Sequence, residues 1–492
     1  MNKYILKAVL CSALVAPMLT SCELDQFPET SLPTEKSWAY VSDATNYNTG
    51  LLAMLRSTCT AGRTVSEIQS DLFNLRATGT SAMQYHNWRF TTAQADGDAT
   101  WTSNYGTISN ANNIINNIDK IVVEEGSDDE ALLKKYKATA YFARAYCYAN
   151  MVTRFCKNYE SVEAAKTTLG LPLVTEVDVN AKPSRASLEK TYELICEDID
   201  QALTLFEDKT NTEYAEPNYY VAKALQARVF LQMKKYPEAV EAAKEVMAKY
   251  PLSEDKAAFK AMWTEDYGTE IIYEPQQTVD ERSTMYGVYI AYSTQLDTFN
   301  PEYLPTQGLM DLYERSDWRR TLFFGKTGAA AGDVIDESAY IMTKFPGNEE
   351  LKQTSEYDFY NMTKAFRVAE MYLIAAEAQY RIDGTGADFL NALRTNRNAK
   401  EINATGAALF AEIKNEWARE MCGEGFRLEC LKRWGDPCKR MEPQPLAAGF
   451  LITNDGFTNL SKPADDFHWV WEIPSQDLQA NPNLERNWPS EK

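Results

Sequence analysis

The spacing of apolar residues indicates that most of this chain is helical. Between residues 132 and 155, apolar or small side chains recur every three or four positions, which places them on one face of a long helix. The members of this stripe are Leu133, Tyr136, Ala140, Ala143, Cys147, Met151 and Phe155. A similar period occurs in residues 37–58, 101–118 and 188–206. We therefore expect a mainly α-helical protein.

Residues 219–251 predict a helical hairpin. Small alanines recur along both arms, Lys234-Lys235-Tyr236 forms the turn, and Pro237 suits the first position of the second helix. Pro251 ends that helix. The pattern is similar to a tetratricopeptide repeat, although a generic helical hairpin has nearly the same one. Because such repeats cannot bury their faces alone, the neighbouring helices are expected to stack on the hairpin.

Two long segments, residues 72–100 and 257–347, lose this regularity. Their only predicted strands are short, at residues 271–274 and 288–291. Long irregular segments in a compact domain usually carry function, and these two combine aromatic rings with polar side chains, so we expect a ligand surface there. The predicted ligand contacts are Arg76, Tyr85, His86, Trp88, Arg89, Tyr286, Tyr289 and Tyr292. For each of them the alternative is a packing role, and we assign Trp101 and Trp318 to packing.

The chain begins with a secretory signal. Lys3 and Lys7 flank a short apolar run that ends in Leu19-Thr20-Ser21-Cys22. The run is too short and interrupted to remain as a membrane-spanning helix, which needs about 20 apolar residues. Its end resembles a bacterial lipobox, which implies cleavage before Cys22 and lipid attachment to that cysteine. The alternative is an ordinary signal that happens to end near a cysteine.

Composition excludes several classes of function. The formal charge is −20, and removal of residues 1–21, which carry two lysines and no acid, makes it −22. Such acidity disfavours nucleic acid, whose binding depends on Lys and Arg. The chain has only two histidines, which disfavours a His-based catalytic triad, and its sequence contains no phosphate-binding loop motif. Seven cysteines follow Cys22 with no zinc-like spacing, so we expect neither a disulfide framework nor a metal, and no cofactor. Residues 95–98 (Ala-Asp-Gly-Asp) could bind calcium but are interpreted as a turn.

Four segments near the C-terminus carry a family resemblance. They are residues 366–381, 389–399, 413–435 and 471–484. The matching positions are Arg367, Ala369, Glu370, Leu373, Ala376, Glu377, Ala378, Leu390, Asn391, Arg394, Arg397, Glu416, Glu420, Glu424, Gly425, Arg427, Leu431, Arg433, Trp434 and Gly435. In this order they resemble the C-terminal half of the SusD/RagB family, and the lipobox and the helical hairpin fit its N-terminal half. Trp417, where Arg is common, and Glu485-Arg486, where Gln usually precedes Asn487, depart from the pattern.

The resemblance implies an outer-membrane lipoprotein that faces the cell exterior. Such a protein binds a glycan and delivers it, as a hinged lid, to a SusC-like TonB-dependent transporter. A peptide-binding import lipoprotein of the RagB type is the alternative, and a surface glycosidase or a pure scaffold is a third. The implied organisation is a signal peptide (1–21), a tether (22–36) and one domain (37–492) with a helical-repeat half (37–255) and a loop-rich signature half (256–492).

We interpret the signature acids as structural. Glu420 and Glu424 could in principle form a glycosidase acid pair. However, Arg419 and Arg427 are close enough in sequence to neutralise them, and Arg367, Glu370 and Glu377 can pair with one another at helical spacing. The chain is therefore predicted not to be an enzyme.

Overall fold

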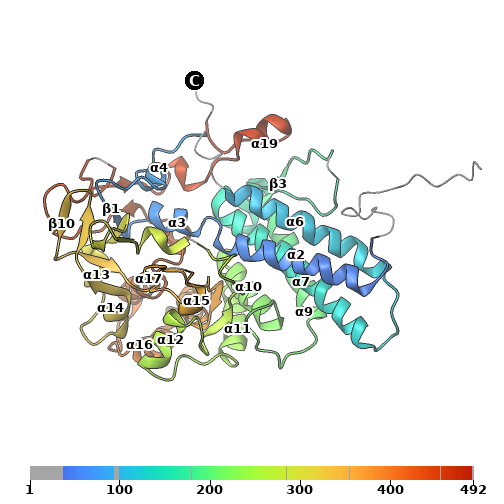
Figure 1. The fold of residues 1–492 in the computed structure, drawn as a ribbon. Helices are drawn as coiled ribbons and strands as arrows, with labels where there is room; N and C mark the ends of the chain where they lie inside the picture. The colour runs from blue at the N-terminus through green and yellow to red at the C-terminus, as the bar shows by residue number, and fades with distance from the viewer. Residues whose placement is uncertain are drawn as a thin grey trace, which may run out of the picture.

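The computed structural model describes residues 37–92, 99–178, 180–283, 285–353, 355–454 and 456–489. The predicted lipid attachment at Cys22 and the turn at 95–98 lie outside these ranges. Within them helices dominate and strands are short, which confirms the mainly helical prediction (Figure 1). None of the helices described is long and apolar enough to cross a membrane.

The N-terminal half is a row of packed helices. Its long members are α2 (Val41–Thr60), α6 (Ala99–Asn117), α7 (Asp128–Phe155), α9 (Leu188–Leu205), α10 (Tyr219–Gln232) and α11 (Tyr236–Met247). The central one, α7, packs against α6 and α9 and buries the whole predicted stripe from Leu133 to Phe155. The hydroxyl of Ser127 accepts a hydrogen bond from the Glu130 amide (3.2 Å), which caps this helix at its first turn.

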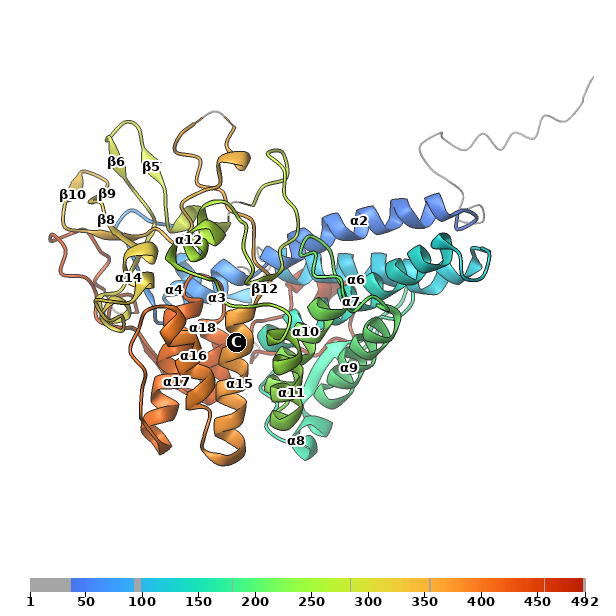
Figure 2. The same ribbon diagram turned by 90° about the horizontal axis from the view of Figure 1, so that it is seen from below.

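The predicted hairpin is present as α10 and α11. Lys234 adopts a left-handed conformation (φ 59°) at the turn, and Pro237 lies in the first turn of α11. The second arm, α11, packs against α15 (Val368–Asp383), the first long helix of the C-terminal half (Figure 2). The hairpin thus joins the two halves of the chain.

The C-terminal half is built on α15 to α18. After α15 come α16 (Ala387–Asn396), α17 (Gly406–Met421) and α18 (Arg427–Trp434). Shorter helices fill the connections: α3 (Arg63–Gln69), α4 (Met83–His86), α8 (Val162–Thr167), α12 (Lys256–Thr264), α13 (Gln307–Asp311), α14 (Trp318–Phe323) and α19 (Ser475–Ala480). The described part of the chain also contains four 3₁₀ turns: η1 (Ile118–Lys120), η2 (Met285–Val288), η3 (Glu349–Leu351) and η4 (Phe467–Trp469).

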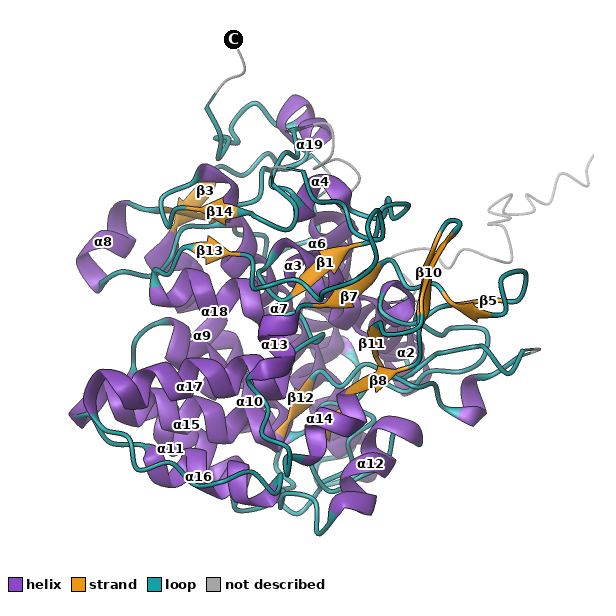
Figure 3. Ribbon diagram, turned by 90° about the vertical axis from the view of Figure 1, so that its left-hand side faces the viewer, coloured by secondary structure: helices purple, strands orange, loops and turns teal. Residues whose placement is uncertain are grey.

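Every described sheet has two antiparallel strands, and these short strands are scattered among the helices and loops (Figure 3). The pairs are β1 (Phe73–Leu75) with β7 (Tyr303–Pro305), β2 (Leu169–Pro172) with β3 (Arg185–Ser187), β4 (Ile271–Tyr273) with β12 (Phe366–Arg367), β5 (Tyr292–Ser293) with β6 (Thr298–Phe299), β8 (Phe324–Lys326) with β11 (Tyr340–Met342), β9 (Ala329–Ala331) with β10 (Val334–Asp336), and β13 (Cys438–Lys439) with β14 (Ser461–Lys462).

One strand prediction is confirmed and the other is wrong. The strand predicted at residues 271–274 is β4. Residues 288–291 do not form a strand, because the chain turns through η2, where the Tyr289 amide donates to the Tyr286 carbonyl (3.0 Å), and pairs only from Tyr292 onward. The Tyr289 ring is drawn into the core instead, 4.8 Å from the Phe73 ring. The seven cysteines in the described part of the chain are all free thiols.

Candidate functional site

The aromatic residues predicted as ligand contacts in the first irregular segment lie in the core. Tyr85, His86 and Trp88 are 4%, 0% and 1% exposed. The Trp88 indole donates to the Gln69 carbonyl (2.7 Å), and His86 Nδ1 lies 2.8 Å from the Ile68 carbonyl. These side chains fasten the segment to α3. As packing residues with no free ring face, they contradict the prediction of ligand contact.

Two tyrosines of the second segment are also packing residues. Tyr286 stacks on Phe345 with ring centroids 3.7 Å apart, and Tyr289 is fully buried. Burial raises the pKa of both phenols. Because an aromatic residue in an irregular stretch can face either the core or the solvent, the sequence pattern alone could not separate these tyrosines from exposed ones.

Three predicted residues remain at the surface. Arg89 is exposed beside Gly456, whereas Arg76 and Tyr292 are half-buried. Partial burial lowers the pKa of Arg76, whose Nη1 donates to the Thr78 hydroxyl (3.0 Å). The same nitrogen lies 3.5 Å from the Ala330 carbonyl of β9, and β9 packs against β6, the partner of the strand that carries Tyr292. Arg76 and Tyr292 are therefore linked through β9 and β6.

Tyr292 forms half of a tyrosine pair that the sequence analysis missed. Its ring stacks on that of Tyr357 with centroids 3.8 Å apart and planes 5° from parallel. The β5–β6 hairpin, which carries Tyr292, and the loop after η3, which carries Tyr357, project from the same side of the molecule (Figure 2). We call Tyr292 and Tyr357 the tyrosine platform. Only the fold brings these distant positions together, so no local motif could have shown the pair.

The tyrosine platform is held in position by its own neighbours. The Tyr292 hydroxyl donates to Oδ1 of Asp297 in the hairpin turn (2.7 Å), and this hydrogen bond raises the pKa of the phenol. The Phe299 ring packs edge-on against Tyr292, with centroids 5.3 Å apart. Both contacts fix the ring orientation before any ligand arrives, which lowers the entropy cost of binding.

The guanidinium of Arg282, which precedes η2 in the chain, packs against the loop that carries Tyr357. Arg282 covers the Tyr360 ring at 4.0 Å and donates to the Leu351 carbonyl (2.9 Å), and its Nη1 is 3.6 Å from an Asp358 carboxylate oxygen. Flat aromatic faces beside forked charged groups can stack on the C–H face of a sugar ring and hydrogen-bond to its hydroxyls. This surface is thus suited to a polyhydroxylated ligand.

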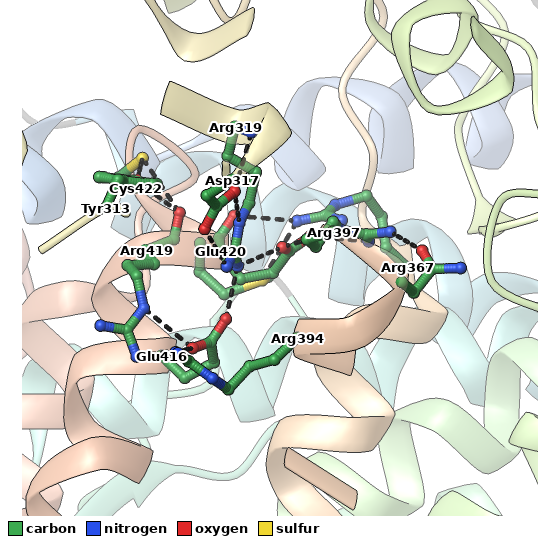
Figure 4. Close-up of polar contacts among 12 residues, drawn as sticks. Tyr313, Asp317, Arg319, Arg367, Arg394, Arg397, Glu416, Arg419, Glu420 and Cys422 are labelled. Carbon is green, nitrogen blue, oxygen red and sulfur yellow. Dashed lines mark hydrogen bonds and ion pairs between the residues drawn. The ribbon is translucent and has the colours of Figure 1, made fainter. Parts of the chain in front are cut away.

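The signature carboxylates form a buried charge network (Figure 4). Glu420 lies 2.9 Å from Arg319, 2.9 Å from Arg367 and 3.1 Å from Arg397. Burial alone would raise the pKa of this carboxyl, but the three guanidinium groups outweigh it and hold the pKa well below its usual range. A permanently ionised, solvent-excluded carboxylate cannot supply the proton that glycoside hydrolysis requires.

The structural interpretation of these acids agrees with the network, but the partners predicted for them are wrong. Arg419 pairs with Glu416 (2.6 Å) and Arg427 with Asp71 (2.7 Å), while Glu424 pairs with Lys344 (2.6 Å). The tertiary packing of α17 places partners from other elements closer than the sequence neighbours.

The predicted pairing within α15 is wrong for the same reason. Arg367 precedes the helix, in β12, and pairs with Glu424. Two carboxylates of α15 point to different neighbours: Glu370 binds Arg228 of α10 (2.6 Å) and Glu377 binds Arg433 of α18 (2.8 Å). Each signature residue thus ties α15 to a separate element.

The described residues form a mainly helical protein, and among them no group of three or more His, Cys, Asp or Glu could hold a metal. The SusD family model matches residues 99–489, and the chain belongs to the SusD family. This membership confirms the resemblance and the mainly helical fold. It also confirms the prediction of a binding protein rather than an enzyme, because SusD family proteins are non-catalytic.

Relatives and solved structures agree with the family. The SusD-like protein P2 of Formosa agariphila is 25% identical over 475 residues, which cover 86% of each chain. A SusD superfamily protein from Bacteroides thetaiotaomicron superimposes with a TM-score of 0.76 at 22% identity, covering 92% of this chain and all of the other. A surface glycan-binding protein A from Bacteroides fluxus superimposes with a TM-score of 0.68 at 20% identity, covering 90% and 97%.

Proposed function

We propose that this chain is a surface-exposed lipoprotein of the outer membrane that binds an oligosaccharide on the tyrosine platform. It delivers the glycan, as a lid, to a SusC-like TonB-dependent transporter. Family membership supports a binding role, and the Leu19-Thr20-Ser21-Cys22 sequence supports lipid anchoring at Cys22. Solved structures with this fold include a SusD-like carbohydrate-binding protein from Bacteroides vulgatus and the glycan-binding protein from Bacteroides fluxus, which supports a glycan as the ligand.

The stacked pair Tyr292 and Tyr357 is the observation that carries this proposal. Here two rings stand together on a projecting hairpin and loop, with Arg76 linked to the hairpin through β9 and with Arg282 packed against the loop that carries Tyr357. A sugar can stack on such rings while nearby charged groups bind its hydroxyls.

The test is calorimetric titration of the soluble protein that starts after Cys22 with panels of neutral oligosaccharides and of peptides. We expect an oligosaccharide to bind and Tyr357→Ala to weaken that binding at least about tenfold, since a lost stacking contact and lost order in Tyr292 together exceed about 1.4 kcal/mol. Tyr267→Ala, which removes a 66% exposed tyrosine outside the platform, is the matched control and should bind normally.

The transporter partnership has a separate test. The full-length lipoprotein, solubilised from outer membranes in mild detergent, should copurify a TonB-dependent transporter, and Cys22→Ser should abolish its membrane attachment. Peptide binding without any sugar binding would favour the peptide-import alternative. Copurification of the transporter, with no binding of either ligand, would favour a protein that acts only as a lid.

A further inference from the structure

A narrow cavity lies where the two halves of the chain meet. Its lining residues come mainly from α7 and α10 and from α3 and the start of α18. The space open to the centres of water-sized spheres is about 40 Å³. Because one water needs roughly 10–15 Å³ on this measure, the cavity holds a few waters or one small polyatomic ion.

Three arginines line this cavity, and one of them has no carboxylate partner. Arg63 is only 6% exposed. Arg63 donates to the backbone carbonyls of Lys364 (3.4 Å), Glu424 (3.3 Å) and Ala365 (3.2 Å), and the Tyr146 side chain also hydrogen-bonds to it. Within the described ranges no Asp or Glu oxygen lies within ion-pair distance of its guanidinium. A buried charge without a counter-charge is costly.

Each of the other two arginines forms an ion pair with one glutamate. Arg228 makes a two-point pair with Glu370 (2.6 and 2.7 Å), and Arg154 lies 3.1 Å from Glu429. Glu424, which also lines the cavity, is already engaged by Arg367 and Lys344. The positive charge of Arg63 is therefore left without a carboxylate partner in the cavity wall.

The entrance offers further hydrogen-bonding groups. Asn150, Thr153 and Gln232 also line the cavity and are half-buried. The Asn150 side chain already binds Arg154 and Asn104, and the Thr153 hydroxyl donates to the Asn150 carbonyl (3.2 Å). The side-chain amide of Gln232 can donate to the outer oxygens of a bound anion while the guanidinium groups bind the inner ones. This local patch contrasts with the rest of the chain, whose formal charge is strongly negative.

We propose that this cavity binds a small oxyanion, of the size of a carboxylate, sulfate or phosphate group, with Arg63 as the central ligand. The anion supplies the counter-charge that Arg63 lacks and joins α3 and α18 to α7 and α10. Its source is either a free ion or the acid group of a longer ligand whose remainder stays outside the entrance. The site is separate from the tyrosine platform and does not depend on sugar binding there.

The experiment measures thermal unfolding and calorimetric binding of the soluble protein with acetate, sulfate, phosphate and glucuronate, against chloride at equal ionic strength. We expect saturable binding and stabilisation by at least one oxyanion. Binding should weaken at least about tenfold in Arg63→Met, because a charge-assisted hydrogen bond contributes more than the 1.4 kcal/mol that equals a factor of ten. Ala149→Phe, which fills the cavity and keeps the arginines, should also weaken it.

Arg381→Met is the matched control, since it removes an exposed arginine from α15 away from the cavity and should leave binding unchanged. Binding of glucuronate as tight as that of acetate would identify the acid group of a longer ligand, and binding of free ions alone would identify a free ion.

Oxyanion effects no larger than those of chloride, or equal binding by Ala149→Phe, would overturn the proposal. Crystals soaked in selenate decide the question if both cavity variants fail to fold: anomalous density beside Arg63 supports the site, and its absence there rejects it.

Discussion

Arg367 and Glu424 form a two-point ion pair in the protein core. Nε of Arg367 lies 3.0 Å from Oε2 of Glu424, and Nη2 lies 2.7 Å from Oε1. Both residues are buried. The pair fastens the strand before α15 to the turn between α17 and α18, so two segments far apart in sequence are held at one fixed distance.

Loss of one partner of this pair should strongly destabilise the protein. Glu424→Leu leaves Arg367 and Lys344 short of a counter-charge in the core, and a broken buried pair costs about 3–5 kcal/mol. The measurement is chemical denaturation followed by circular dichroism. Glu412→Leu is the control, because that glutamate pairs with Arg419 at the partly exposed edge of the network and its loss should cost about 1 kcal/mol or less. Equal effects of both variants would contradict a structural role for Glu424.

Two glycines in the signature segment should differ sharply in their response to alanine. Gly425 and Gly435 both have a left-handed conformation (φ 87° and 71°). A Cβ at Gly425 would lie 2.8 Å from the Cα of Arg63, whereas a Cβ at Gly435 would meet open space. Gly435→Ala should therefore cost about 1 kcal/mol for the backbone conformation alone, and Gly425→Ala clearly more, because α3 would have to move. Thermal melts of the two variants test this, and a Gly425→Ala protein as stable as Gly435→Ala would refute the close approach of α3.

Periodic patterns predicted the helices well because burial imposes one-sided apolar stripes. The stripe from Leu133 to Phe155 is buried along α7, and the hairpin at residues 219–251 has its turn at Lys234. Partners of buried charges could not be predicted in this way. Glu420 binds arginines from three other elements rather than its sequence neighbour Arg419, because ion pairs in a packed core follow tertiary proximity.

The ligand surface was harder to predict than the fold. Aromatic richness in an irregular segment pointed to Trp88 and Tyr289, yet both rings complete the core that a long loop-rich half must bury. Of the predicted ligand contacts, only Tyr292 lies in the tyrosine platform. Its partner Tyr357 comes from a loop for which the sequence predicted no ligand contact.

Trp88 should therefore behave as a core residue when it is removed. Trp88→Ala deletes a buried ring that lies edge-on to Trp469, and it leaves the Gln69 carbonyl without its donor. The expected loss is about 3–5 kcal/mol of unfolding free energy. The measurement is urea denaturation monitored by fluorescence. A variant that retains full stability but loses ligand binding would return Trp88 to the ligand site.

Stability should fall below about pH 4.5 because Glu416, a buried carboxylate with a lowered pKa, must then take up a proton. The pKa of Glu416 is about 2: burial alone would raise it, but Arg319, Arg419 and Arg394 outweigh that effect. Since the ordinary value is 4.5, this group stabilises the folded state above pH 4.5, and the contribution is lost as the pH falls toward 2. The difference corresponds to about 3 kcal/mol.

Denaturant midpoints measured between pH 6 and pH 3 test this dependence. The midpoint should fall steadily below about pH 4.5. A midpoint that does not fall below about pH 4.5 would show that the arginines around Glu416 do not lower the pKa of its carboxyl.

The central claim is that an oligosaccharide binds on the tyrosine platform, and titration of wild-type, Tyr357→Ala and Tyr267→Ala proteins with the best oligosaccharide of the panel tests it most directly. The account predicts that Tyr357→Ala weakens binding at least about tenfold at unchanged stability and that Tyr267→Ala binds as tightly as wild type. Equal affinity of all three proteins for the sugar would contradict it.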